Sequence, residues 1–305
     1  MGKRASIVIP VHNEEVTIFQ NIPVLIEFLQ ERLTDFEVVL VENGSTDKSR
    51  EEAERLAQEF ERVRTISLPD PCLGNALKKG FLSSKFEKTV YFPADLSTDL
   101  CFITDSLSLL DDYDVVVGSK RADPSSDERT ILRRLSSKLY HRLVSGFLGL
   151  WLTDTTCVKA FRREVIMGLI NSAPSVSHIY ETELLAEAVR RGYRIIEIPV
   201  RVFNNRRSRE SLMFKAYTKL RDLLSLNLDV LSIYFGLILS ISGLTALAIF
   251  STSKLLPLNQ LQVDPHIIMY SIIIAIFGIQ SIAIGLLANL FLQIRREFIN
   301  NSTRD

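Results

Sequence analysis

A short segment that follows an apolar run carries side chains that could bind a cation. In VYFPADLSTDL, residues 90–100, the apolar run ends at Pro93, and Asp95, Ser97 and Asp99 then occupy alternate positions. Carboxylate oxygens, together with substrate phosphates and water, are the usual ligands of Mg²⁺. The same residue types also form turns and cap helices, so this segment alone leaves both interpretations open.

Three further polar clusters follow apolar runs in the same way. They are PVHNEE, ENGSTD and GSKR, at residues 10–15, 42–47 and 118–121. Each one by itself is an ordinary turn. In an open parallel sheet, however, ligands bind outside the carboxyl ends of the strands, so four clusters on one edge predict a pocket of carboxylates, amides and basic groups. Such a pocket suits a nucleotide and its phosphates.

Two common ways of holding a diphosphate are absent from the sequence. There is no G-x-G-x-x-G after the first apolar run and no G-x-x-x-x-G-K-[ST] anywhere. A bound diphosphate would therefore be neutralised by a divalent cation, Mg²⁺ or Mn²⁺, which needs few protein oxygens.

The elements that must position these clusters alternate along the first half of the chain. Short β-branched runs predict strands at residues 6–11, 37–41, 63–68, 89–92 and 114–118. Helical patterns lie between them at residues 14–32, 49–60, 74–85 and 98–110, and Ser49 and Glu52 have the spacing of a capping box. A second section predicts helices at residues 131–148 and 179–191 and strands at residues 155–161 and 193–200. This order predicts an α/β fold with a mostly parallel sheet covered on both faces.

The C-terminal part has a different composition. Residues 230–250 and 267–294 contain no charged side chain, and each run exceeds the roughly 20 residues that span a bilayer. The alternative is a pair of buried helices in a soluble core. Basic residues flank the pair of runs, whereas the connecting segment has only Lys254, so the positive-inside rule places the N-terminal domain and both termini in the cytoplasm.

Charge and cysteine content narrow the choice of partners. The formal net charge is zero, but basic residues dominate residues 120–142 and 201–221, and both stretches could attract lipid headgroups or phosphates. We expect no nucleic-acid partner.

Residues 211–227 combine apolar and basic positions as in an amphipathic helix on a membrane surface, although a helix packed under the N-terminal domain has the same pattern. Three dispersed cysteines indicate reduced thiols.

The motifs taken together resemble a known family. VIPVHNEE, VENGSTD, PADLS, DVVVGSKR, DTTCVKAF, YETELL and RGYRIIEIPVRV follow one another as in the family-2 glycosyltransferases of GT-A fold. Within that family they resemble the polyprenyl-phosphate hexosyltransferases, which include the dolichyl-phosphate mannose and glucose synthases. The resemblance covers roughly residues 5–210, and it is specific because the motifs share order and spacing rather than because any one is strong.

The resemblance implies roles for individual residues. Donor nucleotide-sugar binding is expected from Pro10, His12, Glu14, Glu42, Asn43, Ala94, Asp95 and Lys120. Catalytic roles are expected for Asp95, Asp154, Lys159 and Arg121, and metal binding for Asp95 and Ser97. The two basic stretches are expected to hold the acceptor phosphate through Arg129, Arg133, Arg134, Arg206, Arg207 and Arg209.

Three positions depart from the family pattern. Pro93 replaces the first aspartate of the metal motif, Glu42-Asn43 replaces the usual Asp-Asp, and Cys72-Leu73-Gly74 replaces Gly-Lys-Gly. The lost carboxylate at Pro93 leaves Asp95 as the expected main ligand of the cation.

The resemblance implies transfer of a hexose from a nucleotide-sugar to a polyprenyl phosphate, with inversion, at the cytoplasmic face of the membrane. The D-T-x-C-x-K pattern favours UDP-glucose as the donor, followed by GDP-mannose. There are two alternatives. One is a glycosyltransferase with another lipid or glycan acceptor, and the other is a membrane-anchored, non-catalytic protein that binds a nucleotide-sugar. A homo-oligomer is also possible with any of them.

The predicted organisation is a GT-A domain over residues 1–210, an interface helix over 211–227, a hairpin over 228–297 with spans at about 230–250 and 267–292, and a tail over 298–305.

Overall fold

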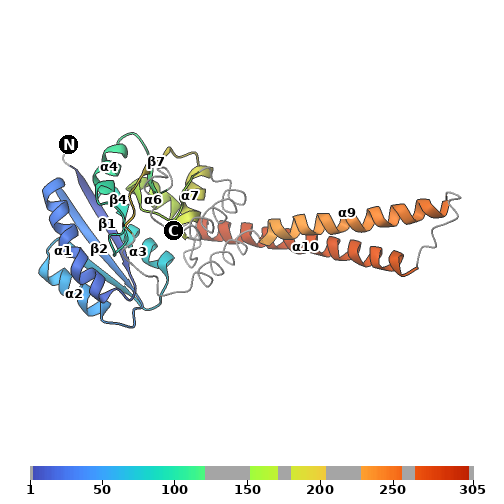
Figure 1. Ribbon diagram of the computed structural model, residues 1–305, viewed down its shortest axis with the longest axis horizontal. Helices are drawn as coiled ribbons and strands as arrows, with labels where there is room; N and C mark the ends of the chain where they lie inside the picture. The colour runs from blue at the N-terminus through green and yellow to red at the C-terminus, as the bar shows by residue number, and fades with distance from the viewer. Residues whose placement is uncertain (1–2, 121–151, 171–179, 204–227, 256–264, 302–305) are drawn as a thin grey trace. The chain divides into compact units, whose positions relative to one another are not determined.

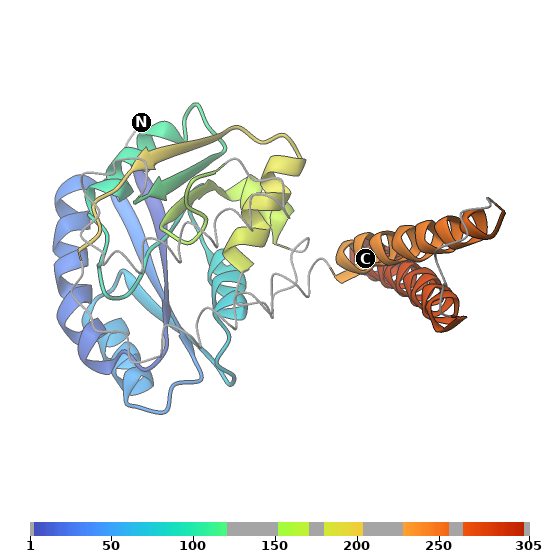
Figure 2. The same cartoon turned by 45° about the vertical axis from the view of Figure 1, so that its right-hand side comes forward.

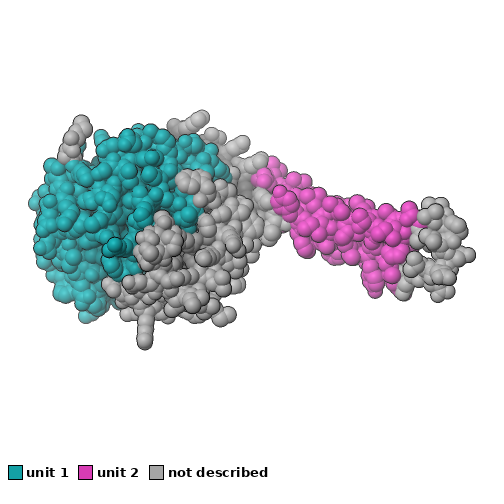
Figure 3. Space-filling model, turned by 45° about the horizontal axis from the view of Figure 1, so that its top comes forward, with its two compact units in different colours: residues 1–220 teal, residues 221–305 magenta. Residues whose placement is uncertain are grey.

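The structure, a computed structural model, describes residues 3–120, 152–170, 180–203, 228–255 and 265–301. The chain divides into two compact units, residues 1–220 and residues 221–305, which Figure 3 distinguishes by colour. The predicted helix over 131–148 and the predicted interface helix over 211–227 lie outside the described residues.

The first unit is built on a seven-stranded sheet with the order β3-β2-β1-β4-β6-β5-β7. The strands are β1 (Arg4–Val11), β2 (Asp35–Asn43), β3 (Val63–Leu68), β4 (Lys88–Tyr91), β5 (Val115–Ser119), β6 (Lys159–Arg162) and β7 (Ile195–Pro199). Neighbouring strands are parallel except that β6 runs antiparallel to both β4 and β5. This confirms the predicted mostly parallel sheet. The reversed direction of β6 was not predicted, and it brings the start of β6 to the edge where the parallel strands end.

Helices cover both faces of this sheet (Figures 1 and 2). They are α1 (Glu15–Arg32), α2 (Ser49–Glu59), α3 (Leu73–Ser83), α4 (Cys101–Leu109), α6 (Arg163–Leu169) and α7 (Tyr180–Arg190). Buried residues of α1, α2 and α4 share one core cluster with alternate residues of the strands, whereas α3 packs on the opposite face with α6 and α7 beside it.

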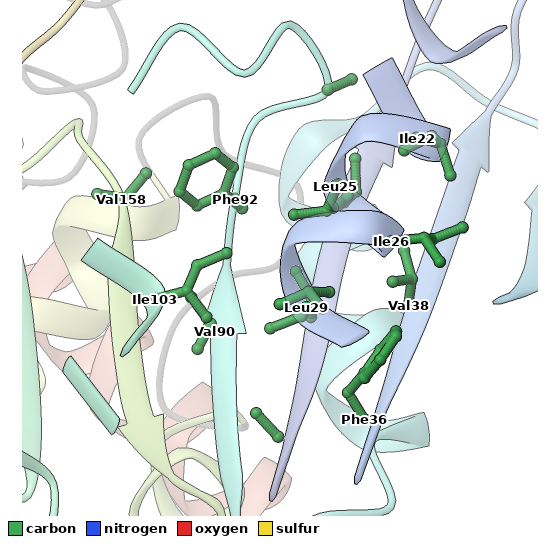
Figure 4. Packing of buried hydrophobic residues seen from close by; sticks show 14 of the residues in the cluster. Ile22, Leu25, Ile26, Leu29, Phe36, Val38, Val90, Phe92, Ile103 and Val158 are labelled. Atoms are coloured by element: carbon green, nitrogen blue, oxygen red, sulfur yellow. The ribbon is translucent and has the colours of Figure 1, made fainter. Parts of the chain in front are cut away.

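The core beneath α1 shows why this segment is helical. Ile22, Leu25 and Leu29 recur at helical spacing, so one face of α1 is continuously apolar. All three side chains are buried against the sheet, and Figure 4 shows Leu29 between Val90 of β4 and Val38 of β2, with Leu25 and Ile22 farther along the helix. The alternation of buried and outward residues along the strands supplies the matching apolar face.

The helix on the other face lies unusually near the sheet. A Cβ added to Gly80 of α3 would meet a methyl group of Val8 and would lie 3.2 Å from a methyl group of Val41. A residue without a side chain is therefore what allows α3 to pack directly on β1 and β2.

Within the described residues the bounds of the predicted elements are reproduced to within a few residues, but α6 was not predicted and the predicted capping box is wrong. Helix α2 begins at Ser49 with Lys48 as its N-cap, the Lys48 side chain makes no capping hydrogen bond, and the amide of Ser49 donates to Asp47, at 3.0 Å. The Ser49 hydroxyl instead donates to Asp47 and accepts a hydrogen bond of 2.7 Å from the amide of Glu14. Ser49 thus ties two loops together, which is a long-range contact that local spacing does not encode.

The second unit consists of α9 (Leu228–Leu255) and α10 (Pro265–Asn301). Their windows Ser232–Phe250 and His266–Phe291 have mean hydropathies of 2.1 and 2.3, and only 17% of each window is buried. Two helices long and apolar enough to cross a membrane are therefore present, as predicted. The outward surfaces of both helices are apolar and exposed within this unit. The alternative of two helices buried in a soluble core therefore does not account for their apolar composition.

Small residues form the interface between α9 and α10. A Cβ on Gly236 would lie 2.5 Å from the carbonyl oxygen of Gly278, and one on Gly243 would lie 2.7 Å from that of Ser271. These pairs run in opposite directions along the two helices, so the helices are antiparallel. Close approach through small residues is a common way for helices to associate within lipid.

Candidate active site

The loops after β1 and β2 are joined into one structure. Asn13 has a left-handed φ of 56°, and its side-chain oxygen accepts hydrogen bonds from the amides of Thr46 (2.8 Å) and Asp47 (3.4 Å). The His12 ring lies at the surface, with Nδ1 3.0 Å from the carbonyl oxygen of Asn43. The loops after β1 and β2 are therefore held side by side at the carboxyl edge of the sheet. Pro10 lies next to the last residue of β1 at this edge.

Glu42 and Asn43 lie beneath that surface rather than on it. Both are buried, and Glu42 accepts a hydrogen bond of 2.6 Å from the amide of Ser45, across Gly44 with its φ of 65°. Glu42 therefore shapes the turn. Its expected contact with the base or ribose of a donor remains a prediction.

The segment after β4 contains one carboxylate at the start of a helix and one in a loop, and the ligand role predicted for the second stays a prediction. Asp99 accepts a hydrogen bond of 2.9 Å from the amide of Cys101, the first residue of α4, so Asp99 serves the start of the helix. Asp95 uses one oxygen for the amide of Ser97, at 3.0 Å, around Leu96 with its φ of 44°. Within the described part of the chain the other oxygen of Asp95 takes part in no hydrogen bond or ion pair, and the residue is partly exposed.

The loop that carries Asp95 is fixed from two sides. Asn21 of α1 donates a hydrogen bond of 3.0 Å to the carbonyl oxygen of Ala94. The carbonyl oxygen of Ser97 accepts one of 2.7 Å from the amide of Phe203, and Thr98 forms a β-bridge with Val202. A rigid loop that leaves one carboxylate oxygen unused is suited to bind a cation or a substrate hydroxyl.

A buried ion pair lies beyond the end of β5. Lys120 Nζ is 3.3 Å from Asp154 Oδ2, and the two side chains are 20% and 2% exposed. Asp154 Oδ1 accepts hydrogen bonds from the amide and hydroxyl of Thr156, at 3.0 and 3.1 Å. The predicted residues Lys120 and Asp154, 34 positions apart in the sequence, are thus in direct contact.

Lys159 occupies the middle of the sheet. It pairs with Tyr91 of β4 on one side and Val117 of β5 on the other, so the segments that hold Asp95, Lys120 and Asp154 all flank it. Its Nζ donates hydrogen bonds of 2.6 Å to Glu181 Oε2 and to the carbonyl oxygen of Cys157, and the side chain is 2% exposed. Lys159 therefore reaches a reacting group only through its neighbours, and its predicted catalytic role remains untested.

Two pKa shifts are consistent with this crowding of charges. Burial raises the pKa of Tyr91, and the charges of Glu181, Cys157 and Asp95 raise it further. Burial also raises the pKa of the Cys157 thiol, with Asp154 adding to the effect and Lys120 opposing it. A raised pKa favours the neutral thiol, as is usual for a cysteine buried in the core cluster.

Sequence reasoning missed Glu181 and Glu197, which support this cluster. Glu197 of β7 accepts hydrogen bonds from the amides of Thr153 (2.8 Å) and Asp154 (3.1 Å). A single acid within the apolar run YRIIEIPV was the available signal, because a carboxylate in a strand core needs partners. The predicted residues outside the described part of the chain are Arg121, Arg129, Arg133, Arg134, Arg206, Arg207 and Arg209.

The described residues fit a cation only in company with a substrate. Among them there is no group of three or more His, Cys, Asp or Glu side chains arranged to hold a metal ion. Asp95 nevertheless offers one unused oxygen on a fixed loop, beside Ser97. Mg²⁺ is typically held by one or two carboxylates with phosphate oxygens and water completing its shell, so this donor set fits a cation that binds together with a diphosphate.

The fold and the strand-end site define a GT-A type nucleotide-sugar-binding domain. The sequence profile described as glycosyl transferase family 2 matches residues 6–169, more than half of the chain. The chain belongs to glycosyl transferase family 2.

Curated relatives include glycosyltransferase AglD of Haloferax volcanii, 34% identical over 205 residues that make up 65% of this chain and 33% of the relative. The dolichyl-phosphate beta-glucosyltransferase of Saccharomyces cerevisiae is 26% identical over 218 residues, which are 64% of this chain and 65% of the relative. The chain thus spans less than two thirds of the length of each of these relatives.

Solved structures confirm the fold. The glucosyl-3-phosphoglycerate synthase of Mycobacterium tuberculosis in complex with UDP superposes with a TM-score of 0.54 at 22% identity, covering 73% of this chain and 80% of the synthase chain. The same synthase has been crystallised with Mn²⁺, UDP and its product, with a TM-score of 0.51. Divalent cations are therefore used by a protein of this fold.

Proposed function

We propose that this protein transfers a hexose from a nucleotide-sugar to a polyprenyl phosphate at the cytoplasmic face of a membrane. The observation that carries the proposal is the presence, in one family-2 chain, of an unused Asp95 oxygen at the carboxyl edge of the sheet and of two exposed apolar helices. Relatives named for transfer to dolichyl and undecaprenyl phosphates support the choice of acceptor.

The chemistry asks little of a general base. A phosphate monoester has a second pKa of about 6, so the acceptor oxygen is already largely ionised at cytoplasmic pH. That oxygen attacks the anomeric carbon, the bond from this carbon to the nucleoside diphosphate breaks with inversion, and the diphosphate leaves with the electron pair. The protein has to hold two anions close together in a productive orientation.

The described residues divide this task between two loops. Asp95, with Ser97, would hold the divalent cation that neutralises the leaving diphosphate. Asp154 is as buried as Lys159, so it would orient the acceptor or a sugar hydroxyl through Lys120, which is 20% exposed and supplies a positive charge next to it. The arginines at 129, 133 and 134 and at 206, 207 and 209 would hold the acceptor phosphate.

The donor is proposed to be UDP-glucose, with GDP-mannose as the next choice. The glucosyltransferase name of the yeast relative and the UDP complexes of the fold neighbours agree with the D-T-x-C-x-K pattern on this point.

The test uses membranes that contain the full-length protein, a panel of radiolabelled nucleotide-sugars and a polyprenyl phosphate. Label is expected to enter the organic phase with one donor, and Asp95→Ala should lower the rate by at least about 10²-fold. Asp99→Ala is the matched control, because this carboxylate of the same segment serves the start of α4 and should be dispensable for transfer.

Unchanged transfer by Asp95→Ala would refute the role of Asp95. Absence of transfer from every donor, in membranes where the protein still binds a nucleotide-sugar, would favour the non-catalytic alternative. Transfer only to a glycan or to another lipid would replace the acceptor.

A further inference from the structure

The side chain of Glu197 in β7 binds the segment before β6 that contains Thr153 and Asp154, which we call the Asp154 loop. Its Oε1 accepts hydrogen bonds from the amide of Thr153 (2.8 Å), the amide of Asp154 (3.1 Å) and the hydroxyl of Thr153 (3.2 Å). A carboxylate that accepts from adjacent backbone amides holds the backbone of a loop more firmly than a contact between side chains does.

The loop held in this way determines the direction of the Asp154 side chain. With its amide bound to Glu197 and its Oδ1 closed onto Thr156, Asp154 directs Oδ2 to Lys120, 3.3 Å away. The Thr153 hydroxyl also lies 2.7 Å from that of Ser119, the residue before Lys120.

The strand register links both halves of the ion pair to the same carboxylate. Glu197 pairs with Val117 of β5, three residues before Lys120, while its side chain reaches the backbone of Thr153 and Asp154. A change at Glu197 is therefore expected to separate Lys120 from Asp154 while the loops after β1 and β2, which Glu197 does not contact, stay in place.

We propose that Glu197 is a positioning residue that sets the Lys120–Asp154 pair through the backbone of the Asp154 loop. The proposal rests on the proposed function for its catalytic consequence, because Asp154 is there assigned to orient the acceptor or a sugar hydroxyl. A displacement of about 1 Å at a reacting group can lower a rate by about 10²-fold.

The first measurement does not depend on activity. In the purified full-length protein, the rate at which a lysine-acylating reagent modifies Lys120 is followed by mass spectrometry, with exposed lysines of the same sample as internal references. Glu197→Ala should raise the relative acylation rate of Lys120 to the rate found in Asp154→Asn, the variant in which the negative charge next to Lys120 is removed directly. Glu197→Gln, which keeps a carbonyl oxygen as acceptor, should stay near the wild-type rate.

The second measurement compares turnover and donor binding. Glu197→Ala should lower kcat by about 10²-fold while the Kd for the nucleotide, measured by calorimetry, stays within about threefold, because the loops after β1 and β2 stay in place. Glu197→Gln should recover most of the activity.

A buried carboxylate at the other end of the sheet controls for simple loss of stability. Glu37 accepts hydrogen bonds from the Ser6 hydroxyl, the Lys85 amide and Arg64, at 2.6, 2.6 and 2.7 Å. Glu37→Ala should lower Tm as Glu197→Ala does, yet leave kcat and the Lys120 modification rate unchanged at a temperature where both variants are folded.

The outcomes separate the two proposals. A wild-type Lys120 rate in Glu197→Ala, or equal effects of the Glu197 and Glu37 variants, would overturn the positioning role. The expected Lys120 result in a protein that transfers no sugar would uphold the positioning role and refute the proposed function.

Discussion

At the scale of single residues, two aspartates four positions apart differ because of their partners. Each accepts a hydrogen bond from the amide two residues further on, but the amide that Asp99 binds is the first of α4, whereas the amide that Asp95 binds belongs to Ser97 in the loop. Asp99 therefore has a structural explanation at the start of a helix, and Asp95 is the carboxylate that we propose to bind a ligand.

Because Asp95 supplies one carboxylate and Pro93 supplies none, cation and nucleotide should bind together. Calorimetry is expected to show weak Mn²⁺ binding without nucleotide and clear Mn²⁺-dependent binding of UDP or GDP. The factor by which Mn²⁺ tightens nucleotide binding should fall by at least about tenfold in Asp95→Asn. Mutation of residues that only hydrogen-bond to metal ligands already lowers metal affinity by about 10–100-fold. Asp99→Asn should keep it. Tight Mn²⁺ binding by the nucleotide-free protein would place the ion elsewhere.

At the scale of elements, the two ends of the sheet have different tasks. The carboxyl end carries the loops of the candidate site. At the amino end, Ser6 of β1, Glu37 of β2 and Arg64 of β3 form a hydrogen-bonded group that also holds the amide of Lys85, ahead of β4. This group joins three strands and the α3–β4 connection, and so stabilises the amino end of the sheet, away from the candidate site.

The Glu37 group predicts a dependence of stability on pH. Burial alone would raise the pKa of Glu37, but the hydrogen bonds from Arg64, Ser6 and the Lys85 amide outweigh it and lower the pKa below its ordinary value of 4.5. A folded-state pKa below the unfolded one stabilises the protein above pH 4.5 or so, and this contribution is lost as the pH falls through the folded-state value.

The free energy of unfolding of the wild type should therefore decrease more steeply below about pH 5 than that of Glu37→Gln, whose amide cannot titrate there. Chemical denaturation in detergent at several pH values measures the difference. Parallel curves for the two proteins would show that Glu37 does not contribute to acid sensitivity.

At the scale of the whole molecule, the chain combines a family-2 domain with a pair of antiparallel apolar helices. The helix pair exposes an apolar surface outward and joins its own members through Gly236, Gly243 and Gly278. Such a pair is stable in lipid because all backbone groups are bonded within helices and the small residues allow close packing.

The distribution of basic residues predicts how this pair is oriented. Single cysteines placed at Thr303 or Asn259, in a protein whose native Cys72, Cys101 and Cys157 are replaced by serine, can be tested with a membrane-impermeant maleimide on intact cells. The cysteine at 259, in the connecting segment, should react, and the one at 303 should react only after permeabilisation. The reverse pattern would place the catalytic domain on the other side of the membrane.

The sequence by itself determined those features that local patterns encode. Alternating β-branched and helical runs predicted most of the elements in their order, and two long uncharged runs predicted the helix pair. Polar residues after the strands placed Asp95 and the His12 loop at the carboxyl edge of the sheet, where their roles remain a proposal. Each of these follows from side-chain periodicity or composition within a single segment.

Only the tertiary structure decided how distant segments meet. β6 is inserted antiparallel between β4 and β5, which places Lys159 inside the sheet and brings Asp154 beside Lys120, and Glu197 of β7 holds that loop from the neighbouring strand. Strand order and direction are set by the packing of the whole sheet and are not encoded in the period of any one strand. For this reason the carboxylate that organises the Asp154 loop could be recognised only after the strands were assembled.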